Sequence, residues 1–333
     1  MASDYYAIKA LSHSMLSCLA QNPMECKMRY VDDPPTLPKK DTAAFAMGHA
    51  VHCLALEPER FDERFVVVEK VLSANSTAGQ IAAWLLDKSN EGKAFPWVAK
   101  PEDINRRTNA GKAEWEAFVR QCLMEHQIIV DKDEIQLARN YADKVKGKTI
   151  LDQQDYADAM ACVQALNNHP EFAAIMAQPQ RVEVPFEFDL FGHRFKAKPD
   201  AIIDSMKLIL DIKTTDDASP HRWQWSAVDY GYHRQAFIYQ GAIELSHANK
   251  EPVRESYRFI FAVVEKPKPS TRGIPPTVAL YELDSETMRM GAEDTHRLVQ
   301  DYETRRETND WQQPYSSGIV PLRLPKRRVY EGE

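Results

Sequence analysis

The chain has 333 residues, of which 44% are hydrophobic, and its formal net charge is −7. This length allows one large domain or two small ones, each with a sizeable core. The negative net charge argues against a protein that coats nucleic acid by bulk charge. It does not exclude a nuclease, because a local acidic metal site and a local basic track can cancel in the total.

The sequence carries no signal for a membrane or for secretion. No apolar run approaches the roughly 20 residues that span a bilayer, and the first 18 residues lack a basic segment followed by an apolar one. The five cysteines form no CxxC pair, and none follows Cys162. Since such cysteines are typical of reduced thiols, we expect a soluble, cytoplasmic protein.

The N-terminal half is predicted to be mainly helical. Apolar residues recur at helical spacing between breakers such as Glu57-Pro58 and His169-Pro170. We expect helices at 43–56, 78–89, 105–126, 133–146 and 153–168.

From Arg181 the hydrophobic period becomes that of a strand. Apolar side chains at 182, 184, 186 and 188 alternate with polar residues and Pro185. A turn at 190–193 leads into 194–203, and with a strand over 208–212 this predicts three antiparallel strands. A helix at 233–246, strands at 257–265 and 277–283, and a closing helix at 285–306 follow. The expected fold class is α+β, a mixed sheet with helices around it.

Two segments are predicted to be irregular. Residues 266–276 contain four prolines and three basic residues, and residues 311–325 are rich in Pro, Ser and Gly. The first is either a plain surface connection or a DNA contact. We expect one nuclease domain over 1–333, with a mainly helical part at 1–180, a sheet core at 181–310 and an irregular tail at 311–333.

The strongest chemical pattern lies in the predicted sheet. Pro199-Asp200 precedes one β-prone run, and Asp211-Ile212-Lys213 lies in the next, after a turn near 204–207. Asp211 and Lys213 are two residues apart and share one face of their strand. Pairing the strands can place Asp200 beside Asp211, giving two carboxylates for a hard cation such as Mg²⁺ next to an ammonium. The alternative is an exposed hairpin with an ion pair.

Four other residues could complete such a site. His52 could add an imidazole nitrogen from its predicted helix, or be a hydrogen-bonded core residue. Gln235 and Tyr239 share one helical face, where they could bind a phosphate or support Lys213, or simply pack. Glu183 is a possible third carboxylate. Because apolar residues alternate with it along the strand, its side chain would point to the opposite face, and a solvated Glu is the alternative.

A polar cluster opens the predicted helix at 105–126. Arg106, Arg107 and Lys112 lie there among amide and hydroxyl side chains. Such groups at a helix N-terminus suit phosphate oxygens. A solvated helix start would have the same composition, so the cluster alone does not choose between the two interpretations.

Read together, these motifs resemble the RecE (exonuclease VIII) family of phage recombination exonucleases, within the PD-(D/E)xK superfamily. The segments that carry the resemblance are LSHSML (11–16), MGHAVHCLALEPERF (47–61), INRRTNAGK (104–112), KPDAI (198–202), ILDIKTT (209–215) and YHRQAFIY (232–239). The family and the wider RecB-like and lambda-exonuclease-like group combine a nuclease core with added helices. The implied activity is Mg²⁺-dependent, processive 5′ to 3′ digestion of one strand from a double-stranded DNA end, leaving 3′ single strands for recombination.

The resemblance also assigns roles to residues. It makes His52, Asp200, Asp211 and the Ile212 carbonyl metal ligands, with Mn²⁺ as a possible substitute for Mg²⁺. Lys213 becomes the residue that orients or deprotonates the attacking water, and Glu183, Gln235 and Tyr239 complete the catalytic set. Arg106, Arg107 and Lys112 become candidates for gripping DNA or its 5′ phosphate. The implied partners are DNA ends, a RecT-like single-strand annealing protein and further copies of the chain in a toroidal tetramer.

The sequence leaves four rival interpretations open. An iron-sulfur exonuclease would need cysteines after the helix that carries Gln235, and the chain has none beyond Cys162. A nuclease fold retained only for DNA binding or assembly would have no need for the full set of acids, lysine, His, Gln and Tyr. A metal-dependent hydrolase of nucleotides, or another PD-(D/E)xK DNA nuclease, would share the same residues.

Overall fold

The computed structural model describes residues 5, 7–37, 43–104, 106–248, 256–313 and 319 of the chain. Contacts divide the chain into two compact units. The first unit comprises residues 1–41, 165–265 and 276–333, and the second comprises residues 42–164 and 266–275. Within the described ranges, no helix combines the length and the apolar content that crossing a membrane requires. The single nuclease domain expected over 1–333 stays a prediction.

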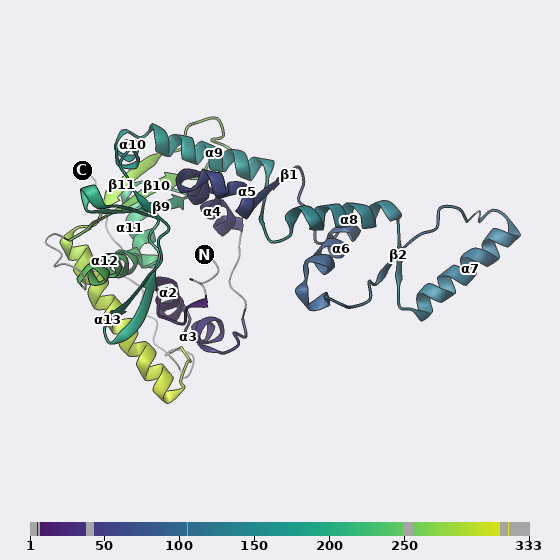
Figure 1. The fold of residues 1–333 in the computed structure, drawn as a ribbon, viewed down its shortest axis with the longest axis horizontal. Helices are drawn as coiled ribbons and strands as arrows, with labels where there is room; N and C mark the ends of the chain where they lie inside the picture. Colours follow the sequence, from purple (N-terminus) through teal and green to yellow (C-terminus); the bar gives the residue numbers. More distant parts are fainter. Residues whose placement is uncertain are drawn as a thin grey trace. The chain divides into compact units, whose positions relative to one another are not determined.

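A five-stranded mixed sheet with the order β11-β10-β9-β8-β5 forms the centre of the first unit (Figure 1). Its strands are β5 (Arg181–Val182), β8 (Ala201–Ile203), β9 (Leu208–Thr215), β10 (Arg258–Glu265) and β11 (Val278–Glu282). β9 and β10 are parallel, and the other neighbours are antiparallel. Because β9 and β10 are rich in Ile, Val, Leu and Phe, they suit a sheet centre that is buried on both faces.

Helices and a separate hairpin complete the first unit. The hairpin consists of β6 (Phe186–Leu190) and β7 (His193–Ala197). The helices are α2 (His13–Gln21), α3 (Pro23–Cys26), the π-helical η1 (Lys27–Val31), α10 (Pro170–Met176), the 3₁₀ turn η4 (Asp204–Met206), α11 (Pro220–Asp229), α12 (Tyr232–Ala248) and α13 (Ser285–Thr308).

Two contacts set the position of α12, which carries several predicted site residues. Its Ala236 and Ile243 pack into an apolar cluster with Phe259 and Phe261 of the sheet. Its other side lies along α13 (Figure 1). Gly291 of α13 permits this close approach, because a Cβ there would lie 2.3 Å from a backbone carbonyl oxygen of α12.

The second unit is mainly helical. It contains α4 (Ala43–Leu56), η2 (Pro58–Arg60), α5 (Phe61–Arg64), β1 (Phe65–Val68), α6 (Thr77–Leu86), η3 (Lys88–Asn90), β2 (Trp97–Ala99), α7 (Asn109–Met124), β3 (Ile128–Val130), α8 (Lys132–Val145) and β4 (Thr149–Asp152). β1 pairs with β4 and β2 with β3, both in parallel. Apolar residues of α6 and α8 form the core between these two helices. The long α9 (Gln153–Asn168) starts in this unit and ends in the first.

The predicted helices are present, and two of their ends are displaced by more than two residues. α4 and α9 have the predicted bounds. α6 ends at Leu86 because the side chain of Asp87 accepts from the backbone of Ser89 and starts a 3₁₀ turn. α7 starts at Asn109 because the Thr108 hydroxyl caps it, accepting from Gly111 N at 3.0 Å. The predicted start at 105 is therefore wrong, and residue 105 itself lies outside the described residues.

The strand predictions need a larger correction. The strand expected over 182–188 is broken, because Glu183 adopts a left-handed conformation with φ of 54°. The strand expected over 194–203 is divided into β7 and β8. The three antiparallel strands therefore belong to two sheets, although β8 and β9 do pair as predicted. The mixed sheet with surrounding helices confirms the α+β class.

The two predicted irregular segments are partly described. Residues 266–276 form turns without a strand or helix, and Arg272 pairs with Asp158 at 3.0 Å within the second unit. At the start of the tail, Trp311 is buried and its ring lies 6.2 Å from that of Tyr302. Residues 314–318 and 320–333 lie outside the described residues.

Candidate active site

Two buried carboxylates meet where β8 joins the sheet. Ala201 pairs with Leu210 in the antiparallel ladder, so Asp200, one residue before β8, falls opposite Asp211 of β9. Asp200 Oδ2 accepts a hydrogen bond from the Ile212 backbone N–H at 2.7 Å. Asp200 is 7% exposed and Asp211 is 0% exposed. The structure thus brings together the two acids that the sequence pattern predicted to be adjacent.

Lys213 completes this group from the same face of β9. Its ammonium forms an ion pair with Asp211 Oδ2. Nζ also lies 5.1 Å from the ring centroid of Tyr232 and 5.8 Å from that of Phe261, a cation–π arrangement. Burial lowers the pKa of Lys213, but the charges of Asp211 and Asp200 outweigh it, and the net shift is upward.

Asp200 lies in the most unfavourable electrostatic position. Burial, and then the charge of Asp211, raise its pKa well above the usual value, while Lys213 opposes the shift. Glu183 adds a further negative charge, since its carboxylate oxygen lies within 4.8 Å of that of Asp200. Lys198 forms an ion pair with Glu183. The left-handed bend at Glu183 therefore directs its side chain toward the other acids, and its backbone N–H donates to the Asp200 carbonyl at 3.0 Å.

Gln235 reaches this cluster from α12. Its Nε2 donates to Asp211 Oδ1 at 2.7 Å, so the amide supports a carboxylate rather than the lysine. Tyr239 lies one turn later on the same helical face. Burial, and then the charge of Asp211, raise the pKa of its hydroxyl well above the usual value. Tyr239 therefore stays protonated at neutral pH.

The donor set of the first unit fits a hard divalent cation. Within the described residues, Gln235 Oε1 is buried without a hydrogen-bond partner, whereas Asp211 Oδ2 forms an ion pair with Lys213. Three carboxylates, from Asp200, Asp211 and Glu183, gather near two ammonium groups. Buried oxygens and excess negative charge are what a Mg²⁺-like ion satisfies. The Ile212 carbonyl stays a predicted fourth ligand.

The remaining predicted site residues belong to the second unit. His52 lies on α4, which is rich in apolar residues, and its role as a metal ligand stays a prediction. Arg106 and Arg107 precede α7, and Lys112 lies in its first turn. All three are exposed, and the Arg106 guanidinium lies 4.7 Å from the ring centroid of Trp115. Their role in gripping DNA also stays a prediction.

Several residues near the site are not evident from the motif. His13 of α2 lies 3.1 Å from the Gly231 carbonyl. Burial, and then the charges of Lys213 and Arg234, lower the pKa of His13 to about 3. Arg234 is buried and pairs with Asp294 of α13. The sequence signal for this group is that His13 and Arg234 lie in two of the segments that carry the RecE resemblance, 11–16 and 232–239.

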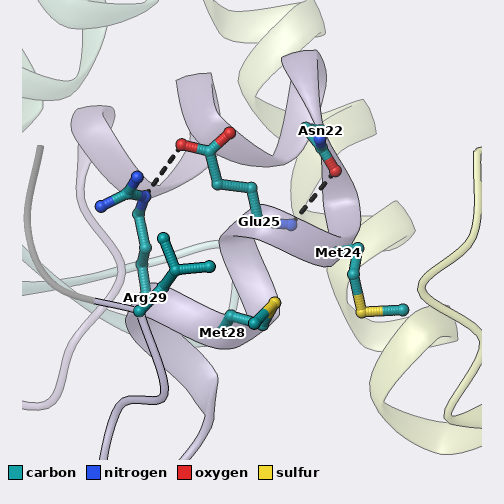
Figure 2. Close-up of a pocket in the computed structure, with 6 residues that line it drawn as sticks. Asn22, Met24, Glu25, Met28 and Arg29 are labelled. Carbon is teal, nitrogen blue, oxygen red and sulfur yellow. Dashed lines mark hydrogen bonds and ion pairs between the residues drawn. The ribbon is translucent and has the colours of Figure 1, made fainter.

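A shallow pocket of about 350 Å³ lies elsewhere in the first unit. It is lined by Asn22, Met24, Glu25, Met28, Arg29 and Leu37. Figure 2 shows the polar side of the pocket. There the Arg29 Nε donates to the Glu25 carboxylate at 2.8 Å, and the Glu25 backbone N–H donates to Asn22 Oδ1 at 3.1 Å. None of the acids or the lysine described above lines this pocket.

The chain belongs to the family described as a PDDEXK-like domain of unknown function (DUF3799), whose model matches residues 12–320. No curated protein matches the sequence. A structure from Eubacterium rectale, provisionally named an exonuclease, is similar with a TM-score of 0.50 at 12% identity, covering 96% of this chain and 93% of that one. A phage-related exonuclease from Haemophilus somnus 129PT has a TM-score of 0.29 at 13% identity, covering 63% and 91%.

Family membership identifies the type of fold. The predicted PD-(D/E)xK core is confirmed, and Pro199-Asp200 with Asp211-Ile212-Lys213 is the part of the chain that matches the name of the motif. The chain is therefore a nuclease-like protein with an acidic site suited to a divalent metal. The closer relation to RecE stays a prediction.

Proposed function

We propose that this chain is a metal-dependent exodeoxyribonuclease that digests linear double-stranded DNA from its ends. The observation that carries the proposal is the cluster of Asp200, Asp211 and Lys213 on paired strands of a PDDEXK-like fold. Following the RecE resemblance, digestion runs 5′ to 3′ and processively. It leaves 3′ single strands for recombination by single-strand annealing.

The residues divide the work of phosphodiester hydrolysis. Asp200, Asp211 and Glu183 would hold Mg²⁺ or Mn²⁺, which when bound activates water and neutralises phosphate charge. Lys213 stabilises the negative charge that develops on the phosphoryl oxygens. Gln235 fixes the orientation of Asp211 through its 2.7 Å hydrogen bond.

The resemblance also supplies proposals for the assembly. We expect a homo-oligomer, a toroidal tetramer by analogy, that works with a RecT-like annealing protein. His52, and Arg106, Arg107 and Lys112, are proposed to contribute a metal ligand and DNA contacts. Light scattering coupled to gel filtration measures the oligomeric state directly.

The decisive experiment is digestion of linear double-stranded DNA labelled at its 5′ or 3′ ends, with Mg²⁺ or with EDTA. Covalently closed circles are the control substrate. We expect Mg²⁺-dependent loss of linear DNA from its 5′ ends, with circles spared. Cutting of circles would indicate an endonuclease, and cutting of neither would favour a nuclease fold kept for DNA binding or assembly.

The variant that tests the proposed role of Lys213 in the same digestion assay is Lys213→Ala. We expect it to abolish digestion while circular dichroism stays that of the wild type, because Lys213 is half-buried and follows the fully buried residues 208–212 of β9. The exposed Lys207→Ala is a suitable control, since Lys207 lies in the turn before β9. A folded Lys213→Ala protein with full turnover would remove the lysine from the mechanism.

A further inference from the structure

Three large apolar residues near the C-terminal end of α11 are exposed, Trp225, Val228 and Tyr230, and they are together termed the aromatic patch. These residues are 46%, 56% and 56% exposed. Trp225 and Val228 are three residues apart on α11 and share one helical face, and Tyr230 follows at the C-cap of the helix.

Tyr232 connects the aromatic patch to Lys213. The Lys213 Nζ lies 5.1 Å from the Tyr232 ring centroid, and the Tyr232 and Tyr230 rings are 5.7 Å apart with a tilt of 30°. The two distances place the Tyr230 ring within about 11 Å of Nζ. At the ~3.4 Å per nucleotide of one strand of B-DNA, this is at most about three nucleotides from a phosphate at the lysine.

The backbone under Tyr230 is held in place. Ser17 Oγ donates to the Tyr230 carbonyl at 3.4 Å, and His13 Nε2 donates to the Gly231 carbonyl at 3.1 Å. Gly231 has φ of 67°, and a Cβ there would lie 1.9 Å from the Arg234 guanidinium. The turn is therefore specific for glycine and fixed by α2. A preordered turn reduces the entropy lost when a ligand binds to its side chain.

Aromatic packing continues below the surface. Tyr232 stacks on Trp223 at 5.2 Å, and Trp223 stacks on Tyr281 at 6.0 Å. Tyr230 is thus the exposed end of a series of rings that is anchored in the core. On the exposed side of α11, Arg222 and Asp229 carry opposite charges. The aromatic patch therefore has rings for stacking but no excess positive charge for binding phosphates.

We propose that the Tyr230 ring is a stacking platform for unpaired bases of the DNA strand at the candidate active site. The inference rests on the proposed function and adds to it the recognition of frayed or single-stranded nucleotides. Every base has a flat π-face, so stacking on tyrosine or tryptophan tolerates any sequence. An enzyme that digests one strand of a duplex end must separate that strand from its complement, which exposes such bases.

The test is binding of a fluorescent oligothymidylate of about 12 nucleotides, measured by anisotropy in EDTA so that no cleavage occurs. We expect Tyr230→Ala to weaken binding by about 5- to 150-fold, the equivalent of ~1–3 kcal/mol for one stacked base. Tyr230→Phe keeps the ring and should stay within about twofold of wild type. Tyr30→Ala removes another exposed tyrosine, 40% exposed on η1, and should have no effect.

The outcomes separate this inference from the proposed function. If wild-type protein digests DNA and Tyr230→Ala binds and digests equally well, the platform is overturned and the nuclease stands. If wild type digests nothing but Tyr230→Ala still weakens oligonucleotide binding, the platform stands and the nuclease proposal falls. A self-association lost in Tyr230→Ala with unchanged DNA binding would assign the aromatic patch to contacts between copies and overturn the platform.

Discussion

Asp200→Asn should stabilise the metal-free protein while removing its activity. The substitution keeps a side-chain oxygen that can accept the 2.7 Å hydrogen bond from Ile212. It removes one of three clustered negative charges. Burial and the charge of Asp211 both raise the pKa of Asp200, so the ionised carboxylate is a net cost to the folded state.

The expected rise in the free energy of unfolding follows from the distance between the Asp200 and Glu183 carboxylates. The carboxylate oxygens of Asp200 and Glu183 lie within 4.8 Å. Two unit charges at that separation repel by about 3.5 kcal/mol at an effective dielectric constant of ~20. Lys198 and Lys213 offset part of this repulsion. We therefore expect the free energy of unfolding to rise by about 1–2 kcal/mol, and Tm by a few degrees.

The pH dependence has a definite sign. A raised folded-state pKa means that the folded protein binds the Asp200 proton more tightly than the unfolded chain does. The stability that the protonated Asp200 contributes is fully present below the ordinary carboxyl pKa of 3.8, and it is lost as pH rises through the raised pKa. Asn does not titrate, so the gain from Asp200→Asn should be larger at pH 7 than at pH 4.

The assay is thermal unfolding in EDTA, repeated with Mg²⁺. Wild type should be stabilised by Mg²⁺, by ~2.7 kcal/mol at one hundred times its Kd, and Asp200→Asn should lose most of that effect. Asp189→Asn is the control, because Asp189 is exposed on β6. A destabilised Asp200→Asn protein in EDTA at pH 7 would refute the electrostatic reasoning, and unchanged Mg²⁺ stabilisation would remove Asp200 from the metal site.

Two further predictions concern groups that support the site. Gln235→Leu removes the hydrogen bond to Asp211 and should slow single-turnover digestion by about 10- to 150-fold, because a hydrogen bond to a charged group contributes ~1.5–3 kcal/mol. An unchanged rate would show that Asp211 needs no such support. The His13 ring should show no NMR titration between pH 5 and 8, because its pKa is about 3, and its contribution to stability should be lost as pH falls from 6.5 toward 3. A midpoint near 6.5 would contradict the burial of this ring.

The central acids were predictable because the information that pairs them is local. β-prone residues on both sides of a four-residue turn define the hairpin of β8 and β9, and its register follows from the turn. Glu183 was harder to place. Alternation over 182–188 predicted that its side chain points away from the apolar face, but a non-glycine residue at φ of 54° breaks that alternation. The left-handed bend has no sequence signature at a glutamate.

The predicted elements do not include the helix α11, although the sequence carries a signal for it. Ser219 and Pro220 stand at its N-cap and N1 positions, the usual place for both residue types. The ring of Tyr232 against Lys213 could not be predicted in this way. That contact depends on how α12 packs on the sheet. Such packing brings together residues that are distant in the sequence, and no local sequence pattern indicates it.

The two aspartates are anchored differently, and this affects how substitutions should be interpreted. Asp200 is held by a backbone N–H, which substitutions at other side chains do not remove. Asp211 is held by two side chains, Gln235 and Lys213. Lys213→Ala therefore removes a catalytic charge and also one of the two anchors of Asp211. Its effect should exceed that of Gln235→Leu, and the two losses should not add in the double variant, because both act through the same carboxylate.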